Sequence, residues 1–296
     1  MELSELNLQL LAEYAVSAAH KAGQLIAKYA QKPIVFNTKK SGSSQASQVV
    51  TEVDHLSQAV ILQTLAPTCE TYDLALLTEE SPDDRQRLQK DFFWCVDPLD
   101  GTLAFVQSKP GYSVSIALVS QLGEPYIGII YDPLSQTLYQ AVKGKGILKN
   151  GKPFLPKQLA SSTSILMMSA DPGFLDHPFC SEIETAMRSI AKELGYHDLK
   201  IQIQAGAAMN TCSVLENNPA CYFKFPKPQD GGGSLWDFAA SACLFVEAGA
   251  VVSDIYGNTL ALNSPDSTFM NKKGVLYASN IKLAKRIRDL YIAMSK

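Results

Sequence analysis

The chain has 296 residues, of which 46% are hydrophobic and 19% are charged, an ordinary balance for a globular protein with a sizeable core. This length suits one large domain or two closely joined halves. With 26 Lys and Arg against 29 Asp and Glu, the formal net charge is −3, so the basic excess typical of proteins that bind nucleic-acid polymers is missing. A small anionic substrate remains compatible with this charge if a bound cation supplies positive charge locally.

The N-terminal residues 1–11 lack the basic segment and apolar run of a secretory signal. The most apolar later stretch, Leu235–Val252, is interrupted by Asp237 and Glu247, which argues against a membrane span because a spanning helix needs about 20 mostly apolar residues. The cysteines form no CxxC pair, so reduced thiols in a cytoplasmic protein are the favoured interpretation, and a disulfide between distant positions is the alternative. The six are Cys69, Cys95, Cys180, Cys212, Cys221 and Cys243.

The first half predicts two helices followed by a meander of mainly antiparallel strands. Apolar residues at helical spacing from Leu8 to Ile26 predict an opening helix that ends near Pro33. A polar loop is expected at Thr38–Gln48, and a second helix from Thr51 to Leu65, closed off by Pro67. The predicted strands are Leu74–Leu77, Phe92–Val96, Tyr112–Ser120, Tyr126–Tyr131 and Thr137–Val142.

The second half alternates strands and helices, which predicts a mixed sheet with helices on its faces. We place the boundary near Gly151–Ser161, with an N-terminal α+β half at 1–155, a C-terminal α/β half at 156–296 and the active site between them. The predicted strands are Ile165–Ser169, Ile201–Ala205, Tyr222–Lys224 and one beginning at Val251, and the predicted helices are Phe179–Leu194, Ala207–Glu216 and Trp236–Ala248.

Acidic residues follow two of the predicted strands of the first half. Glu79 and Glu80 come after the first, and Asp97 and Asp100 come at the end of the second. Carboxylates that a rigid sheet brings together repel one another strongly, so such a cluster is tolerated mainly when cations neutralise it. The four histidines are scattered without metal-ligand spacing. The pattern therefore favours Mg²⁺, Mn²⁺ or Ca²⁺ over zinc.

The segment Asp97–Thr102 has the composition of a metal- and anion-binding turn. Pro98 restricts the residue before it and predicts a turn across which Asp97 and Asp100 face a shared centre. Gly101 allows the backbone to approach a ligand, and its N–H with that of Thr102 can bind an anion. Asp-Pro and Asp-Gly also occur in ordinary turns, which is the alternative.

Two further acids have both a structural and a functional interpretation. Asp54 lies three residues after Thr51, in the form of a helix-capping pattern. Asp237 follows Trp236 at the start of a predicted helix, where an acid also interacts favourably with the helix dipole. Taken one at a time, the helix-end interpretation of each is the simpler one.

Taken together, these motifs resemble the inositol monophosphatase superfamily, which includes the 3'(2'),5'-bisphosphate nucleotidases. The matching stretches span about Thr51 to Asp254 in family order. They are Val50–Asp54, Thr78–Ser81, Trp94–Thr102, Ser113–Leu118, Gly206–Asn210, Trp236–Ala240 and Glu247–Ala250. Thr78 stands where the family usually has Gly, and Lys224–Leu235 is longer than the family's usual approach to Trp-Asp.

The resemblance implies a layered αβαβα fold of the sugar-phosphatase type, two or three Mg²⁺ ions, lithium sensitivity and a homodimer. It implies metal ligation by Glu79, Asp97, Asp100, Asp237 and the Leu99 carbonyl. Glu79 and Thr102 would activate the attacking water, with Asp54 orienting Thr102. Asp100, Gly101, Thr102 and Asp237 would bind the substrate.

The expected reaction is Mg²⁺-dependent transfer of a phosphoryl group from a small alcohol to water. Tyr131–Pro133 favours an inositol or polyol monophosphate as substrate. The alternative is 3'-phosphoadenosine 5'-phosphate, whose second phosphate Lys224 and Lys227 would bind near Tyr222 or Phe225, although a solvated surface pair is the favoured interpretation of these lysines. More distant alternatives are an inactive metal-binding member and a Ca²⁺-binding module, and the latter lacks an EF-hand loop.

Overall fold

The computed structural model describes residues 3–31, 36–38, 49–156, 164–203 and 206–295. Apart from Thr38, the predicted polar loop Thr38–Gln48 lies outside these residues, as does part of the predicted boundary Gly151–Ser161.

The first half forms a seven-stranded sheet in which β3 and β4 are parallel and the other neighbours are antiparallel. In sheet order the strands are β3 (Ala75–Thr78), β4 (Phe92–Asp100), β5 (Ser113–Ser120), β6 (Pro125–Asp132), β7 (Thr137–Val142), β8 (Ile147–Lys149) and β9 (Lys152–Pro153). One face is covered by α1 (Glu5–Tyr29) and α3 (Glu52–Tyr72). The short elements are β1 (Phe36–Thr38), β2 (Val49–Thr51), η1 (Gln86–Leu88) and α4 (Thr102–Val106).

The second half forms a five-stranded mixed sheet. In sheet order its strands are β11 (Asp198–Ile203), β10 (Ile165–Ala170), β12 (Ala220–Lys224), β14 (Val275–Ala278) and β13 (Val251–Ser253). The helices are α5 (Cys180–Glu193), α6 (Ala207–Glu216), α7 (Leu235–Glu247) and α8 (Ile281–Met294), and η2 (Pro172–Phe174) follows β10.

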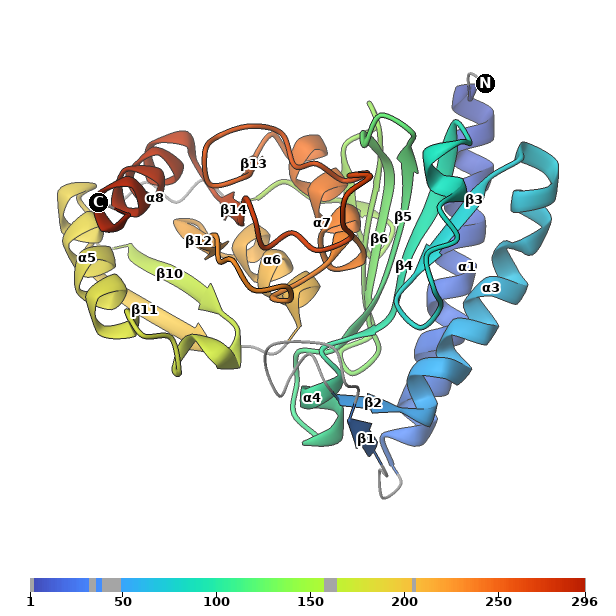
Figure 1. Ribbon diagram of the computed structural model, residues 1–296, viewed down its shortest axis with the longest axis horizontal. Helices are drawn as coiled ribbons and strands as arrows, with labels where there is room; N and C mark the ends of the chain where they lie inside the picture. Colours follow the sequence, from blue (N-terminus) through green and yellow to red (C-terminus); the bar gives the residue numbers. More distant parts are fainter. Residues whose placement is uncertain (1–2, 32–35, 39–48, 157–163, 204–205, 296) are drawn as a thin grey trace.

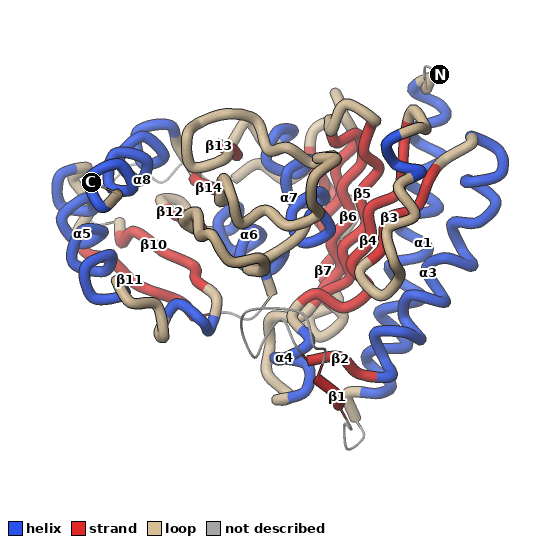
Figure 2. The backbone as a smooth tube through the Cα atoms, in the orientation of Figure 1, coloured by secondary structure: helices blue, strands red, loops and turns tan. Residues whose placement is uncertain are grey.

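The elements form five layers, which confirms the predicted αβαβα arrangement (Figure 1). Of the three hydrophobic clusters, the outer two lie between a sheet and an outer helix layer, and the central one packs α6 and α7 against both sheets. Side chains alternate between the two faces of a strand, so on β4 Trp94 packs toward α1 and α3 while Phe93 packs toward α6 and α7. On β12, Tyr222 packs into that same central cluster, and Phe223 packs into the cluster with α5 and α8. Figure 2 shows α6 and α7 between the two sheets. Their side chains pack in the central cluster with residues of both sheets.

Several predicted element ends differ from the structure by a few residues, among them β11, which begins at Asp198 and not at Ile201, and two of the differences have a clear physical cause. The second helix continues past Pro67 to Tyr72. The carbonyl that Pro67 leaves without a helical donor belongs to the exposed Gln63, and Thr68 anchors this end by accepting a 2.9 Å hydrogen bond from the Trp94 indole. β4 likewise runs on through Asp100, because an irregularity between Asp97 and Asp100 removes Pro98 from the regular ladder.

Candidate metal centre

The parallel pairing of β3 with β4 brings the first two acidic segments together. Thr78 is the register partner of Val96, and the Glu79 N–H donates to the Val96 carbonyl at 3.1 Å. The residues that follow these partners, Glu79 and Asp97, therefore lie side by side at the carboxyl ends of the two strands. Asp97 is buried with 1% exposure, and Glu79 is half-buried.

The segment Asp97–Thr102 is an irregular strand end followed by a helix start, rather than the predicted turn centred on Pro98. The Leu99 N–H donates to Asp97 Oδ1 at 3.0 Å, which fixes that carboxylate. Gly101 has φ +84° and precedes α4, and a Cβ on it would lie 2.6 Å from the Gly111 carbonyl oxygen. Glycine is therefore required there both by conformation and by the close approach of another backbone.

Asp54 both caps α3 and contacts the Asp97–Thr102 segment. Its Oδ2 accepts hydrogen bonds from the Thr51 N–H at 2.8 Å and the Thr51 hydroxyl at 2.6 Å. Its Oδ1 lies 3.0 Å from Thr102 Oγ1, which is also 3.1 Å from the Leu99 carbonyl oxygen. The hydroxyl has one proton, so it donates to one of these acceptors at a time. The capping interpretation and the contact with Thr102 thus hold together.

Asp237 also has two functions in the local structure. Ser234 is the N-cap of α7, and the Ser234 N–H donates to Asp237 Oδ2 at 2.5 Å. The Ser115 hydroxyl of β5 donates to the Trp236 carbonyl at 3.1 Å, which fixes the start of α7 against the first sheet. Asp237, which follows Trp236 in the C-terminal half, is thereby held close to the acids at the ends of β3 and β4.

The carboxylates of Asp97, Asp100 and Asp237 converge, with one oxygen of each within 4.8 Å of the others. Burial raises the pKa of Asp97 and of Asp100 well above its usual range, and the neighbouring carboxylates add to the rise. Burial, followed by repulsion from Glu79, raises the pKa of Asp237 to about 6. The donor set consists of hard oxygen ligands whose repulsion a divalent cation would relieve, so these residues fit Mg²⁺ or a similar ion.

Asp100 makes a contact that the sequence did not predict. Its Oδ1 accepts from the Ala207 N–H at 3.0 Å and its Oδ2 from the Ala208 N–H at 2.9 Å, so it binds the N-terminus of α6. A Cβ on Gly206 would lie 2.2 Å from Asp100 Oδ2. The short Gly-Ala-Ala sequence marks a close approach, but Asp100 is 107 residues from Ala207, so local signals do not identify it as the partner.

A polar network containing Asp171 lies next to the acidic residues. Asp171 directly follows β10, the same signal of an acid at a strand end that identified Asp97. Its Oδ1 accepts from Asn210 Nδ2 and from the Tyr222 hydroxyl, both at 2.9 Å. Lys224 Nζ lies 2.5 Å from Asp171 Oδ2, and its charge acts to lower the pKa of Asp237.

The interpretation of Lys224 and Lys227 as a solvated surface pair is wrong for Lys224. Its side chain is 23% exposed, it is paired with Asp171, and Nζ donates to the Gly232 carbonyl at 2.6 Å. Lys227 is half-buried, and burial together with the nearby Lys224 charge lowers its pKa. A built Cβ on Gly232 would be 3.2 Å from Lys227 Nζ, so both ammonium groups approach the glycine-rich loop before α7.

The sequence matches a known family model over nearly its whole length. The model described as the inositol monophosphatase family matches residues 7–294. The chain belongs to the inositol monophosphatase family. Among its relatives, Nus factor SuhB of Escherichia coli is 31% identical over 244 residues, which cover 82% of this chain and 84% of that protein. The 3'(2'),5'-bisphosphate nucleotidase CysQ of Salmonella typhimurium is 30% identical over 264 residues, covering 88% and 96%.

Solved structures of this family share the fold. An inositol monophosphatase from Anabaena superposes with a TM-score of 0.68 at 24% identity, covering 96% of each chain. The SuhB protein of Bartonella henselae gives a TM-score of 0.71 at 23% identity, covering 93% of this chain and 97% of that one. These similarities establish the layered inositol monophosphatase fold for this chain.

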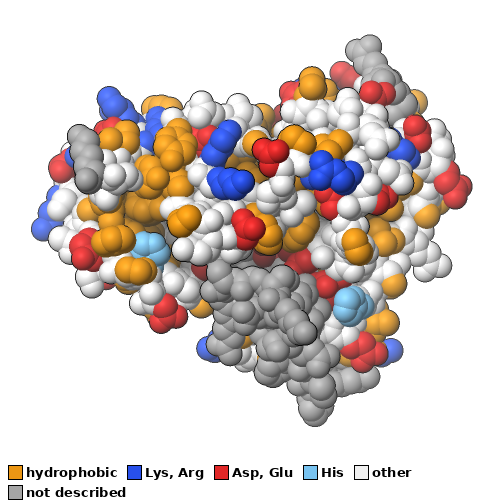
Figure 3. All heavy atoms as spheres, in the orientation of Figure 1, with side chains coloured by type: hydrophobic (Ala, Val, Ile, Leu, Met, Phe, Trp, Pro, Cys, Tyr) orange, Lys and Arg blue, Asp and Glu red, His pale blue; other side chains and the backbone are white. Residues whose placement is uncertain are grey.

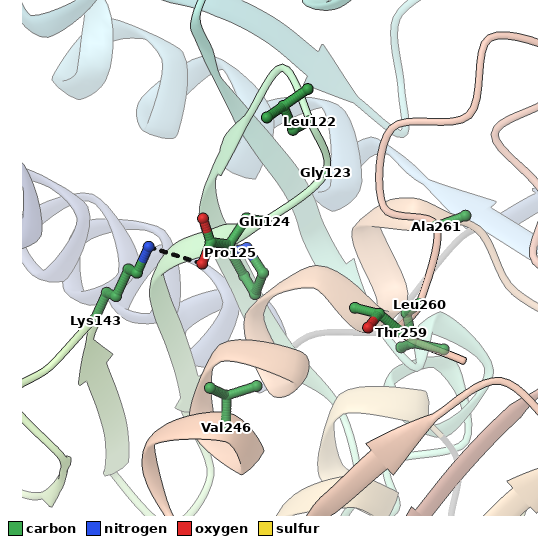
Figure 4. Close-up of a pocket in the computed structure, with 9 residues that line it drawn as sticks. All are labelled: Leu122, Gly123, Glu124, Pro125, Lys143, Val246, Thr259, Leu260 and Ala261. Atoms are coloured by element: carbon green, nitrogen blue, oxygen red, sulfur yellow. Dashed lines mark ion pairs between the residues drawn. The ribbon is translucent and has the colours of Figure 1, made fainter. Parts of the chain in front are cut away.

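A cavity of about 510 Å³ lies away from the acidic centre and is a poor candidate for the family's chemistry. It is lined by residues that include Leu122, Val246 and Leu260 (Figure 4). Its charged lining residues are Glu124 and Lys143, which pair with each other at 2.7 Å. No carboxylate cluster of the kind formed by Asp97, Asp100 and Asp237 lines it.

The remaining surface agrees with the bulk composition. Over the described residues on the face shown in Figure 3, Lys and Arg are interspersed with Asp and Glu. Within the described part of the chain, no helix has the length and apolar character needed to cross a bilayer. All six cysteines are unpaired.

Proposed function

We propose that this chain is a Mg²⁺-dependent phosphomonoesterase that hydrolyses a small phosphate ester with an activated water. The observation that supports this most directly is the convergence of two buried carboxylates from β4 and a half-buried one from α7, with one oxygen of each within 4.8 Å of the others, beside Glu79. Four carboxylates this close together destabilise the folded protein by mutual repulsion unless a cation binds between them, and together they can ligate such a cation. Membership of the inositol monophosphatase family supports the same reaction class.

In this proposal Glu79, Asp97, Asp100, Asp237 and the Leu99 carbonyl hold two or three Mg²⁺ ions. When bound, the ions would lower the pKa of a water molecule and offset the charge on the phosphate and the leaving oxygen.

The chain's own groups would orient the reactants. Glu79 and the Thr102 hydroxyl would hold the attacking water, and Asp54, 3.0 Å from that hydroxyl, would orient Thr102. The Gly101 and Thr102 N–H groups would bind phosphate oxygens, while Asp100 and Asp237 would also contact the substrate. If the Leu99 carbonyl is a ligand, the Thr102 proton is left to Asp54, which fixes the hydroxyl lone pairs toward the water.

The test is phosphate release with Mg²⁺ from a panel of phosphate esters, comparing wild type with Asp100→Asn. The expected result is turnover by wild type and a loss of roughly a hundredfold or more in the variant, because a ligand charge is removed. Equal background release by both proteins on every ester would refute the enzyme proposal and favour an inactive member of the family. All the ligand positions implied by the family are filled in this chain, which supports activity.

For the substrate, an inositol or polyol monophosphate is the first candidate. The second is 3'-phosphoadenosine 5'-phosphate, supported by Lys224 beside Asp237, by Lys227 near Lys224 and Asp171, and by the similarity to CysQ. Comparing turnover of inositol 1-phosphate and this nucleotide on one preparation, with Lys227→Gln as a variant, separates the two. If the chain is a nucleotidase that uses Lys227, the Lys227→Gln substitution raises KM for the nucleotide and leaves KM for inositol 1-phosphate unchanged.

We also propose two properties that family membership implies and one that the cysteines suggest. We expect inhibition by Li⁺, a homodimer in solution measured by light scattering, and a cytoplasmic location, which the unpaired cysteines support.

A further inference from the structure

One face of α3 contacts three different parts of the acidic centre. Asp54, Ser57 and Gln58 are spaced i, i+3 and i+4, so they lie on the same side of the helix. All three are buried, with exposures of 1%, 0% and 8%. Asp54 contacts Thr102 as described above, whereas the other two side chains have no part in the proposed reaction.

Ser57 binds the irregular end of β4. Its hydroxyl donates to the Pro98 carbonyl at 2.7 Å, in a fully buried position. In the register of β4 with β5, Asp97 pairs with Ser115 and Asp100 with Ser113, so two residues of β4 face one residue of β5. Such an irregularity removes carbonyls from the ladder, and Ser57 supplies the donor that the Pro98 carbonyl needs there.

Gln58 binds the turn that carries Glu79. Its Oε1 accepts from the Glu80 N–H at 3.1 Å, and its Nε2 donates to Ser81 Oγ at 2.9 Å. Both ends of one amide are therefore used on two consecutive residues of the turn. The same turn is joined to β4 by the Glu79 N–H bond to the Val96 carbonyl, and Gln58 joins it to α3.

We propose that Ser57 and Gln58 are positioning residues that hold the Asp97–Thr102 segment and the Glu79–Ser81 turn at the separation a divalent cation requires. The inference rests on the proposed function. Mutual repulsion of the carboxylates drives these two segments apart in the absence of metal. Two hydrogen-bonded contacts from one rigid helix oppose that separation, and groups that orient metal ligands typically change metal affinity by 10- to 100-fold.

The test uses Gln58→Met, which keeps the side-chain length and removes both hydrogen bonds, with Gln63→Met on the exposed side of the same helix as the matched control. Binding of Mn²⁺ to the intact chain is measured by titration calorimetry, together with the Mg²⁺ dependence of phosphate release. We expect a Kd for Mn²⁺ about tenfold higher in Gln58→Met, a similar shift in the half-saturating Mg²⁺ concentration, and a kcat near wild type at saturating Mg²⁺. The control changes neither.

Two further variants keep the inference testable if Gln58→Met does not fold. Ser81 is exposed, so Ser81→Ala removes one bond without disturbing the core; it should raise the Kd about two- to threefold and add nothing in the Gln58→Met background. Ser57→Ala should raise the Kd on its own. Unchanged Kd values in Gln58→Met, or in Ser81→Ala and Ser57→Ala, overturn the inference. If wild type binds no Mn²⁺, the proposed function fails as well.

Discussion

Replacing Asp237 with asparagine should stabilise the metal-free protein while removing its response to Mg²⁺. Burial and the Glu79 charge raise the pKa of Asp237 to about 6, from an ordinary value of 3.8. Because each pKa unit corresponds to about 1.4 kcal/mol, keeping this carboxylate ionised costs the folded state up to roughly 3 kcal/mol. Asparagine keeps an oxygen that can accept from the Ser234 N–H and carries no charge.

The pH dependence has a definite sign. A carboxyl whose pKa is raised by folding contributes stability that is fully present below pH 3.8 and is lost as pH rises through about 6. The advantage of the Asp237→Asn variant is therefore largest above pH 7, shrinks near pH 5 and vanishes near pH 4. In a protein of this size, 1 kcal/mol shifts Tm by about 2–4 °C, so the full 3 kcal/mol would raise Tm by about 6–12 °C at pH 7.5.

The assay is thermal unfolding in EDTA and in Mg²⁺, from pH 4.5 to 8, for wild type and for the variant. Asp266→Asn, at an exposed position, is the matched control and should leave Tm unchanged. In Mg²⁺ the order should reverse, because wild type gains stability from the bound ion and the variant does not. A variant that is less stable than wild type in EDTA at pH 7.5, or whose advantage does not change with pH, refutes the argument.

Three other outcomes follow from the same geometry. Asp54→Asn should lower kcat by about 10- to 100-fold with little change in KM, because the Thr102 hydroxyl loses its charged acceptor; steady-state kinetics check this. The same substitution should lower the free energy of unfolding by about 1 kcal/mol, because the cap of α3 is weakened, and denaturant unfolding measures that change. Gly206→Ala should reduce Mg²⁺ affinity, since its Cβ would lie 2.2 Å from Asp100 Oδ2; an unchanged half-saturating Mg²⁺ concentration contradicts this. Chelation should abolish turnover, and restoring Mg²⁺ to 100 times its Kd should recover it and add about 2.7 kcal/mol of stability, read from Tm.

Local patterns predict much of the secondary structure. Thr137–Val142 and Ala207–Glu216 are predicted with the bounds that the structure has. The latter helix has Gly206 before it and Pro219 shortly after it, which are clear end signals. The predictions fail where tertiary contacts compensate for a local signal, as at Pro67, where the Thr68 and Trp94 contact anchors the continued helix.

The C-terminal β14 and α8 were not predicted, although their signals are ordinary. Val275–Ala278 is fully buried, and Asn280 caps α8 by accepting from the Leu283 N–H at 3.0 Å. The position of β14 between β12 and β13 is a different matter, because strand order depends on pairings between segments far apart in the sequence. The contact of Asp100 with the N-terminus of α6 also joins segments far apart in the sequence, so local patterns do not predict it.

Helix N-termini explain why the acids of the candidate centre look structural when each is considered alone. Asp54 caps α3, Asp237 belongs to the cap of α7, and Asp100 accepts from two N–H groups of α6. Each helix end offers N–H donors and a partial positive charge, which lowers the cost of placing carboxylates close together before a cation binds. Asp237 uses Oδ2 for the Ser234 N–H, which leaves Oδ1 for a ligand. Capping and ligand binding are therefore two uses of the same side chain, and a sequence pattern that fits a helix cap is not evidence against a functional role.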